Sequence, residues 1–252
     1  MTATAPTFSL ARFVEDVREL APMRGHVRHA WLPDGRTSLV FRVLDDGRRG
    51  DVSLAGPRTR ARVKDVSGVV RGVIVRFKPG WTVPLFGVAA NEVTDRIVPL
   101  EAIWGHAGAD LYGRLVGTDD VMTLLDAVSG VLVDRARRSF ESSSARLVRR
   151  AAQLLEHGEA RVDRVAALLG ITDRHLRRAF TEHVGVGPKD YARSVRLQRV
   201  LRSSTSSNDW GRIALDAGYF DQAHLIADFR RLMGVTPGAF ATGVREADLH
   251  CN

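Results

Sequence analysis

The sequence VDRVAALLGITDRHLRRAF occupies residues 162–180. Its apolar residues recur at helical spacing on both sides of Gly170, a residue free to adopt the positive φ that ends many helices. Thr172 follows, and its hydroxyl can cap the next helix by accepting a backbone N–H. Leu176, Ala179 and Phe180 then form the apolar stripe of a second helix. The pattern predicts two short helices joined by a sharp turn, a helix-turn-helix.

A second copy of this pattern lies at residues 209–231, DWGRIALDAGYFDQAHLIADFRR. In both copies an alanine precedes the glycine by four residues, and a phenylalanine follows it by ten residues in the first copy and eleven in the second. Gly218 is expected to end one helix and Asp221 to cap the next. One long helix, residues 189–202, is predicted to join the copies. A single copy fits a solvated corner between helices as well as a DNA-binding unit, and the repetition favours DNA binding.

The composition indicates a globular chain with room for two domains: 252 residues, 44% hydrophobic and 26% charged. The one cysteine, Cys251, cannot form an internal disulfide and has no metal-ligand spacing, which suits a reducing compartment. We find no apolar run of membrane-spanning length and no secretion signal, so we expect a cytoplasmic protein without membrane contacts.

The positive charge is concentrated in the second half. The chain carries a net charge of +8, and residues 160–245 hold 13 Arg and one Lys against eight acidic residues, a local balance of +6. Such a concentration predicts a polyanion as partner, although a basic surface can also serve solubility alone.

The first half has a different sequence pattern, in which short strand-like segments are separated by turns of Gly, Pro and Asp. A helix is predicted at residues 10–20, and the strand-like runs are residues 38–44, 51–54, 69–77 and 81–85. Several short strands at this spacing predict an antiparallel sandwich or barrel. The expected fold class is therefore α+β: an N-terminal antiparallel β-barrel-like (cupin-like) domain with helices, followed by an all-α domain with two helix-turn-helix units joined by a long helix.

An enzymatic barrel is the alternative for this half. A metal-binding cupin would need His-x-His with a downstream Glu and a later His, and His26, His29 and His106 do not fit that spacing. No phosphate-binding loop or nucleophile elbow is present either. We therefore expect no enzymatic activity, metal or cofactor, and instead a regulatory barrel.

Four aromatic residues are the candidate lining of a small-molecule effector pocket in that barrel: Trp31, Phe41, Phe77 and Trp81. For any one of them, ordinary core packing is the favoured interpretation.

A helix is predicted at residues 119–138, with acidic residues at its start and arginines at its end, as the helix dipole favours. Its apolar stripe fits packing on the barrel or pairing with a second subunit, and we favour a homodimer. The serine-rich stretch FESSS, residues 140–144, is the predicted domain boundary, before a helix at residues 145–156. Residues 1–140 would form the regulatory, effector or dimerisation domain and residues 141–252 the DNA-binding domain.

Residues 145–241 resemble the AraC/XylS family of transcriptional regulators. The residues that carry the resemblance are Leu169-Gly170, Leu176-x-Arg178-x-Phe180, Gly185, Arg196-Leu197, Ile213-Ala214, Gly218-Tyr219, Asp221-Gln222-x-His224, Phe229 and Gly234-Val235-Thr236-Pro237. The resemblance implies two helix-turn-helix units on a rigid connecting helix, bound to double-stranded DNA, with RNA polymerase as a further partner.

The resemblance also assigns DNA-binding residues. They are Thr172, Arg174, His175, Arg177 and Arg178 in the first unit, Arg196 in the connecting helix, and Gln222, Ala223, His224 and Ile226 in the second unit. Arginine suits the task because its planar fork can bond guanine O6 and N7 together. The family commonly has Arg at the position of Ala227 and Phe at that of Leu225, so the second unit is expected to bind more weakly.

Three functions compete on these grounds: an effector-responsive, sequence-specific transcription factor, a non-specific architectural DNA-binding protein, and an enzyme with an appended DNA-binding module. The third would need a nucleophilic cysteine in a polarised setting, which the terminal Cys251 does not offer. The paired units favour the first.

Overall fold

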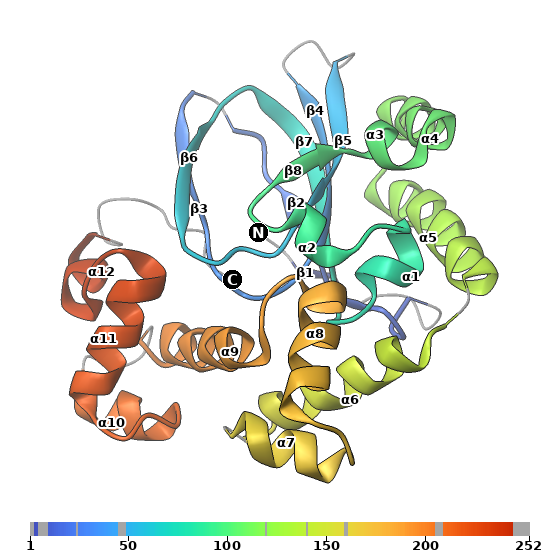
Figure 1. Cartoon of the computed structure of the whole chain (residues 1–252). Helices are drawn as coiled ribbons and strands as arrows, with labels where there is room; N and C mark the ends of the chain where they lie inside the picture. Colours follow the sequence, from blue (N-terminus) through green and yellow to red (C-terminus); the bar gives the residue numbers. More distant parts are fainter. Residues whose placement is uncertain are drawn as a thin grey trace.

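A computed structural model describes residues 3–4, 10–23, 25–44, 49–118, 120–139, 141–158, 161–204 and 209–243 (Figure 1). The expected α+β class is confirmed, with an antiparallel sheet in the first half and helices throughout the second, whereas the barrel-like form of the first half is not confirmed. Cys251, Phe140 and residues 205–208, between the helix-turn-helix units, lie outside the described residues.

The strands gather in the first half of the chain. They are β1 (Ala3–Thr4), β2 (Val14–Leu20), β3 (Val27–Trp31), β4 (Ser38–Leu44), β5 (Gly50–Ala55), β6 (Arg62–Val66), β7 (Val69–Phe77) and β8 (Ile97–Pro99). Six of them form an antiparallel sheet in the order β1-β2-β7-β4-β5-β8, and β3 pairs with β6 in a separate two-stranded sheet. In the described part of the chain the large sheet is open, with β1 and β8 at its edges.

The two sheets share one long, bent ribbon. Leu20 pairs with Gly72 at the end of the β2–β7 ladder, and Val27 pairs with Val66 at the start of the β3–β6 ladder. Between them the backbone N–H of Met23 donates to the carbonyl oxygen of Val69 over 2.7 Å. The β3–β6 sheet is therefore the continuation of the β2–β7 pair, curled away from the large sheet (Figure 1).

Five helices accompany the large sheet: α1 (Thr82–Phe86), α2 (Ala90–Val93), α3 (Leu100–Trp104), α4 (His106–Val116) and α5 (Val121–Arg138). Leu124, Val128 and Leu132 of α5 are buried in the same hydrophobic core as Phe41 and Phe77 of the sheet. The predicted helix is confirmed, and Asp120 caps it by accepting from the N–H groups of Met122 and Thr123. Packing on the sheet accounts for the apolar stripe without a second subunit.

Two expectations for this half were wrong. Residues 10–20 were predicted to be helical, but most of this stretch is strand β2. A β-bulge between Val14 and Asp16 interrupts the alternation of the strand, so that the buried Val14 and Val17 are three residues apart. Residues 81–85 were expected to be a strand and fall largely in helix α1, where Pro84 is tolerated because the first turn needs no N–H from it.

The second half of the chain is helical. Its helices are α6 (Ser143–Glu156), α7 (Val162–Leu168), α8 (Asp173–Val184), α9 (Pro188–Ser203), α10 (Trp210–Asp216), α11 (Gln222–Met233) and α12 (Pro237–Gly243). The predicted helices at residues 145–156 and 189–202 are thus confirmed as α6 and α9. The division into domains at residues 140 and 141 falls between α5 and α6 and stays a prediction.

The two halves touch at a close backbone contact. Gly185 ends α8 with φ +85°, and a Cβ there would lie 2.8 Å from the Ala90 carbonyl oxygen and 2.6 Å from Cγ of Pro57. The Thr94 hydroxyl donates to the Gly185 carbonyl oxygen over 2.9 Å. Only glycine lets the end of α8 approach the N-terminal half this closely.

An ionic cluster forms a second contact between the halves. The Arg36 guanidinium donates to Glu15 on β2 over 2.7 Å, to Glu156 at the end of α6 over 3.2 Å and to the Tyr191 hydroxyl on α9 over 3.1 Å. The Tyr191 hydroxyl in turn donates to Glu156. Burial raises the pKa of Tyr191, so the hydroxyl stays protonated and remains a donor.

No helix within the described residues is both long and apolar enough to span a bilayer.

The glycine contact predicts the effect of two matched substitutions. Gly185 and Gly234 both end a helix with positive φ, but a Cβ at Gly234 would meet no atom within 4 Å. Alanine costs about 1–2 kcal/mol at either position through backbone strain. At Gly185 the contact with Ala90 should add at least about 1 kcal/mol. Urea unfolding of Gly185→Ala and Gly234→Ala measures the difference, and equal losses would contradict the close contact.

His183 predicts a pH dependence of stability. The side chain lies on α8, is 2% exposed, and its Nδ1 has no hydrogen-bond partner. Burial lowers the pKa of His183 below its unfolded value of about 6.5. The unfolded chain therefore binds a proton more readily, and stability falls as the pH drops below about 6.5.

Denaturant unfolding at a series of pH values from neutral to mildly acidic checks this. We expect His183→Gln to flatten the acid decline, whereas His175→Gln, an exposed change on the same helix, should leave it as in the unmodified protein. If the stability of all three proteins fell equally with decreasing pH, His183 would not contribute to the pH dependence.

Candidate nucleic-acid interface

The first unit consists of α7 and α8. Val165 and Ala166 on α7 pack against Leu176 and Phe180 on α8, and all four are buried. At the turn, the Ile171 N–H donates to the Ala166 carbonyl oxygen over 3.0 Å. The two predicted turn residues are confirmed in their places: Gly170 has φ +66°, and the Thr172 hydroxyl caps α8 by accepting from the His175 N–H.

The outer face of α8 is polar and basic. Arg174, His175, Arg177 and Arg178 are all exposed, and Thr172 is exposed at the start of the helix. Arg177 lies 3.9 Å from Asp173 one turn earlier, a surface pair that is worth little energy and leaves the guanidinium available. The structure thus brings the five predicted residues of the first unit together on one surface.

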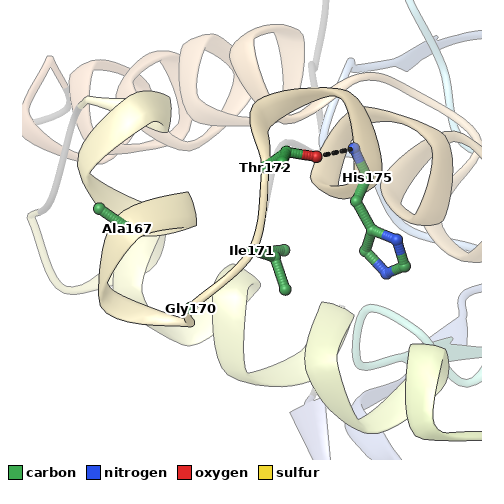
Figure 2. Close-up of a pocket in the computed structure, with 5 residues that line it drawn as sticks. All are labelled: Ala167, Gly170, Ile171, Thr172 and His175. Atoms are coloured by element: carbon green, nitrogen blue, oxygen red, sulfur yellow. Dashed lines mark hydrogen bonds between the residues drawn. The ribbon is translucent and has the colours of Figure 1, made fainter.

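An open depression of about 380 Å³ adjoins this surface at the turn. Ala167, Gly170, Ile171, Thr172 and His175 line it, and Figure 2 shows the Ile171 side chain beside the His175 ring. Its floor is apolar, and its rim carries the exposed His175 and Thr172. Ile171 was not among the predicted site residues, because in the sequence it is simply the apolar residue after the glycine.

The second unit, α10 and α11, repeats the same turn. The Tyr219 N–H donates to the Ala214 carbonyl oxygen over 2.9 Å, Gly218 has φ +87°, and Asp221 caps α11 by accepting from the His224 N–H over 2.7 Å. The predicted caps and turn of this unit are confirmed. Leu225 and Phe229 face inward, as expected from their spacing.

The predicted contact residues of the second unit share its outer face only in part. Gln222, Ala223 and His224 are exposed, and Ile226 is half-buried. The turn is one residue longer than in the first unit, and Phe220 in this longer turn is 85% exposed. The different glycine-to-phenylalanine spacing was the sequence signal for this exposed aromatic residue.

The two units are held by α9. Tyr191 and Ala192 near its start belong to the core of the first unit, and Leu197, Val200 and Leu201 belong to the core of the second. In Figure 1, α8 and α11 both rise from the lower edge of the molecule, where α7 and α10 lie, and α9 spans the distance between them. The recognition helices therefore begin on the same side of the molecule.

Arg196 is placed differently from the other predicted contact residues. Its side chain is 14% exposed and lies between α9 and α11, 3.3 Å from the Asp228 carboxylate. Its guanidinium carbon also lies 5.0 Å from the centre of the Tyr219 ring. The structure groups Arg196 with inward-facing residues rather than with the exposed arginines of α8.

The four aromatic residues predicted to line an effector pocket do not form one group. Phe41, Phe77 and Trp81 are buried in the core, where Phe77 packs on Phe86 with ring centres 5.3 Å apart. Trp31 lies apart on β3, with the Arg58 guanidinium 4.6 Å from its ring centre. Their part in effector binding stays a prediction.

The histidines of the first half also lie apart from one another. His29 packs edge-on against Trp31, and His26 is exposed on the connection before β3. In the part of the chain that the structure describes, no three His, Cys, Asp or Glu side chains gather as a metal site requires.

Comparison with known proteins agrees with this geometry. A family described as a helix-turn-helix domain matches residues 165–243, and a domain of unknown function, DUF6597, matches residues 2–99. The HTH-type transcriptional regulator GlxA of Rhizobium meliloti (strain 1021) is 37% identical over 95 residues, which cover 34% of this chain and 29% of GlxA. The chain thus spans less than a third of that relative's length.

Solved structures with similarity include ToxT from Vibrio cholerae O395, with a TM-score of 0.44 at 10% identity over 90% of this chain and 95% of ToxT. Another is wild-type ToxT from strain SCE256 bound to an unsaturated fatty acid, with a TM-score of 0.43 at 13% identity over 89% and 93% of the two chains. The helix-turn-helix family match spans both repeated turns described above. The chain is therefore similar, within residues 165–243, to a helix-turn-helix domain family, and over 95 residues to a transcriptional regulator.

Proposed function

We propose that this chain is a sequence-specific transcriptional regulator that places its two recognition helices, α8 and α11, in adjacent major grooves of double-stranded DNA. The observation that carries the proposal is the pair of exposed polar helices held on one side of the molecule by a continuous helix, α9. Each unit has the form in which a second helix enters the major groove.

In the first unit, Arg174, Arg177 and Arg178 are proposed to contact bases and phosphates. Guanidinium groups can bond guanine in a planar, bidentate manner, which gives sequence information beyond charge attraction. His175 and the capping residue Thr172 would approach the backbone at the start of the helix, where N–H groups favour phosphate.

In the second unit, Gln222 and His224 supply hydrogen-bonding groups, and Ala223 with Ile226 would contact thymine methyl groups. Ala227 is exposed on the same helix and has no hydrogen-bonding side chain, where the family commonly has arginine. We therefore propose that the first unit contributes more of the specificity than the second.

A regulatory role for the first half is part of the proposal. The segment from Gly56 to Ala61 touches both units: Pro57 lies against Gly185 at the end of α8, and the Ala61 N–H donates to the Leu232 carbonyl oxygen of α11 over 2.7 Å. A small-molecule effector bound in this half would therefore act on both units. RNA polymerase and a second subunit are the further partners we propose, in the cytoplasm.

The alternative is a non-specific architectural DNA-binding protein, which the excess of arginine in the second half supports. A genome-wide binding profile followed by footprinting separates the two functions. Discrete protection of two adjacent major grooves at a recurring sequence would support a regulator. Uniform, salt-sensitive protection at every sequence would support the architectural function.

Substitution of the exposed arginines tests the assignment. Arg174→Ala and Arg178→Ala should each weaken specific binding by about 1–3 kcal/mol because each removes a guanidinium from the groove. Arg138→Ala, which removes an equally exposed arginine from α5, should bind as the unmodified protein does. Mobility-shift titrations on the recurring sequence and on a scrambled one provide the measurement.

The same titrations test the ranking of the two units. Substitutions at Ala227 should cost little. If Gln222→Ala abolished binding while Arg174→Ala bound normally, the second unit would be the stronger contributor and the ranking would be reversed.

A further inference from the structure

Asp228 is a buried acid in the middle of the second recognition helix. It is 6% exposed. Its Oδ1 lies 3.4 Å from Nε of Arg193 and its Oδ2 lies 3.3 Å from Nη2 of Arg196, both on α9. One carboxylate therefore joins the recognition helix to the connecting helix through two arginines.

Burying these charges is expensive, and an apolar side chain at position 228 would pack between the helices at lower cost. An apolar contact, however, leaves neighbouring helices free to settle in more than one register. A carboxylate between two planar guanidinium groups is satisfied in few arrangements. The cluster thus restricts how α11 sits on α9.

His224 lies on the edge of the same cluster. Its ring meets the Tyr219 ring edge-on with centres 5.2 Å apart, and its Nε2 lies 3.9 Å from Oδ2 of Asp228 one turn along α11. The Arg196 guanidinium in turn stacks on the ring of Tyr219, the other contact of His224. His224, which is proposed to contact DNA, is therefore in contact with this cluster through Tyr219 and Asp228.

The first unit is fastened in a different way. The residue before its core phenylalanine, Phe180, is Ala179, whereas Asp228 precedes the corresponding Phe229. The end of α8 is instead anchored by Gly185 against Pro57 and Thr94 of the N-terminal half. The cluster of Asp228 with Arg193 and Arg196 is thus particular to the second unit.

We infer that Asp228, acting through Arg193 and Arg196, is a positioning residue that fixes the orientation of the second recognition helix and so sets the spacing between the two DNA half-sites that the protein accepts. This inference rests on the proposed function. Asp228 itself does not contact DNA, because its carboxylate faces α9.

The test uses the full chain with Asp228→Asn, which keeps the shape of the side chain and removes its charge. The control is Asp216→Asn, which removes an exposed acid from α10 that pairs with Arg212 at 3.7 Å. Fluorescence anisotropy measures binding to three duplexes: the recurring sequence, the same sequence with two base pairs inserted between the half-sites, and the first half-site alone.

For the unmodified protein and Asp216→Asn, we expect the insertion to weaken binding by about tenfold or more, the order of a lost groove contact. Asp228→Asn should bind the uninterrupted sequence about tenfold more weakly and lose little more on insertion. All three proteins should bind the first half-site equally. Loss of half-site binding would instead indicate a general folding defect and overturn the inference.

If Asp228→Asn keeps the full spacing preference, the inference is wrong while the proposed function stands. If the unmodified protein shows no preference for sequence or spacing, the proposed function itself fails. Arg196→Lys provides a second variant, because it keeps the charge and loses the planar fork, and it should relax the spacing preference in the same way.

A double-substitution measurement separates a shared interaction from two independent ones. Arg196→Lys combined with Asp228→Asn should weaken binding to the uninterrupted sequence no more than the stronger single change, since both remove the same contact. Additive losses would show that Arg196 and Asp228 act separately and would overturn the proposed cluster.

Discussion

One helix, α9, supplies side chains to the cores of both helix-turn-helix units, and this sharing determines how α8 and α11 are placed relative to each other. Tyr191 is buried with the first unit and Leu197 with the second, less than two helical turns apart. Because a helix is stiff over this length, neither unit can rotate without losing part of its own core. The separation of the two recognition helices is thus a property of packing rather than of a linker.

The N-terminal half adds a second set of constraints. It meets the first unit through the backbone of Gly185 and through the Arg36 cluster, in which Glu15, Glu156 and Tyr191 come from different parts of the chain. Neither contact covers the exposed residues of α8. The contacts between the two halves therefore leave the basic surface of α8 exposed.

The sequence predicted the helical half well because its information is local. Turn glycines, capping residues and apolar stripes lie within a few residues of one another, and Gly170, Thr172, Gly218 and Asp221 occupy the predicted places. The sheet half was harder, since strand β2 contains a β-bulge that places two buried valines three residues apart. The partnership of Arg196 and Asp228 spans 32 residues and two helices, so no local pattern reveals it. In the sequence, an arginine on a basic helix indicates nucleic-acid binding whether its side chain faces solvent or the protein interior.

The bent ribbon has a mechanical consequence. The near end of the ribbon belongs to the large sheet. Beside its far end, at the start of β6, Ala61 is hydrogen-bonded to α11. The first unit is attached separately, near α2. The two units are thus attached to the N-terminal half at different places, one beside the far end of the ribbon and one near α2. Because α9 is packed into both units, a change in the curvature of the ribbon would strain these attachments or the shared core before it could move one unit relative to the other.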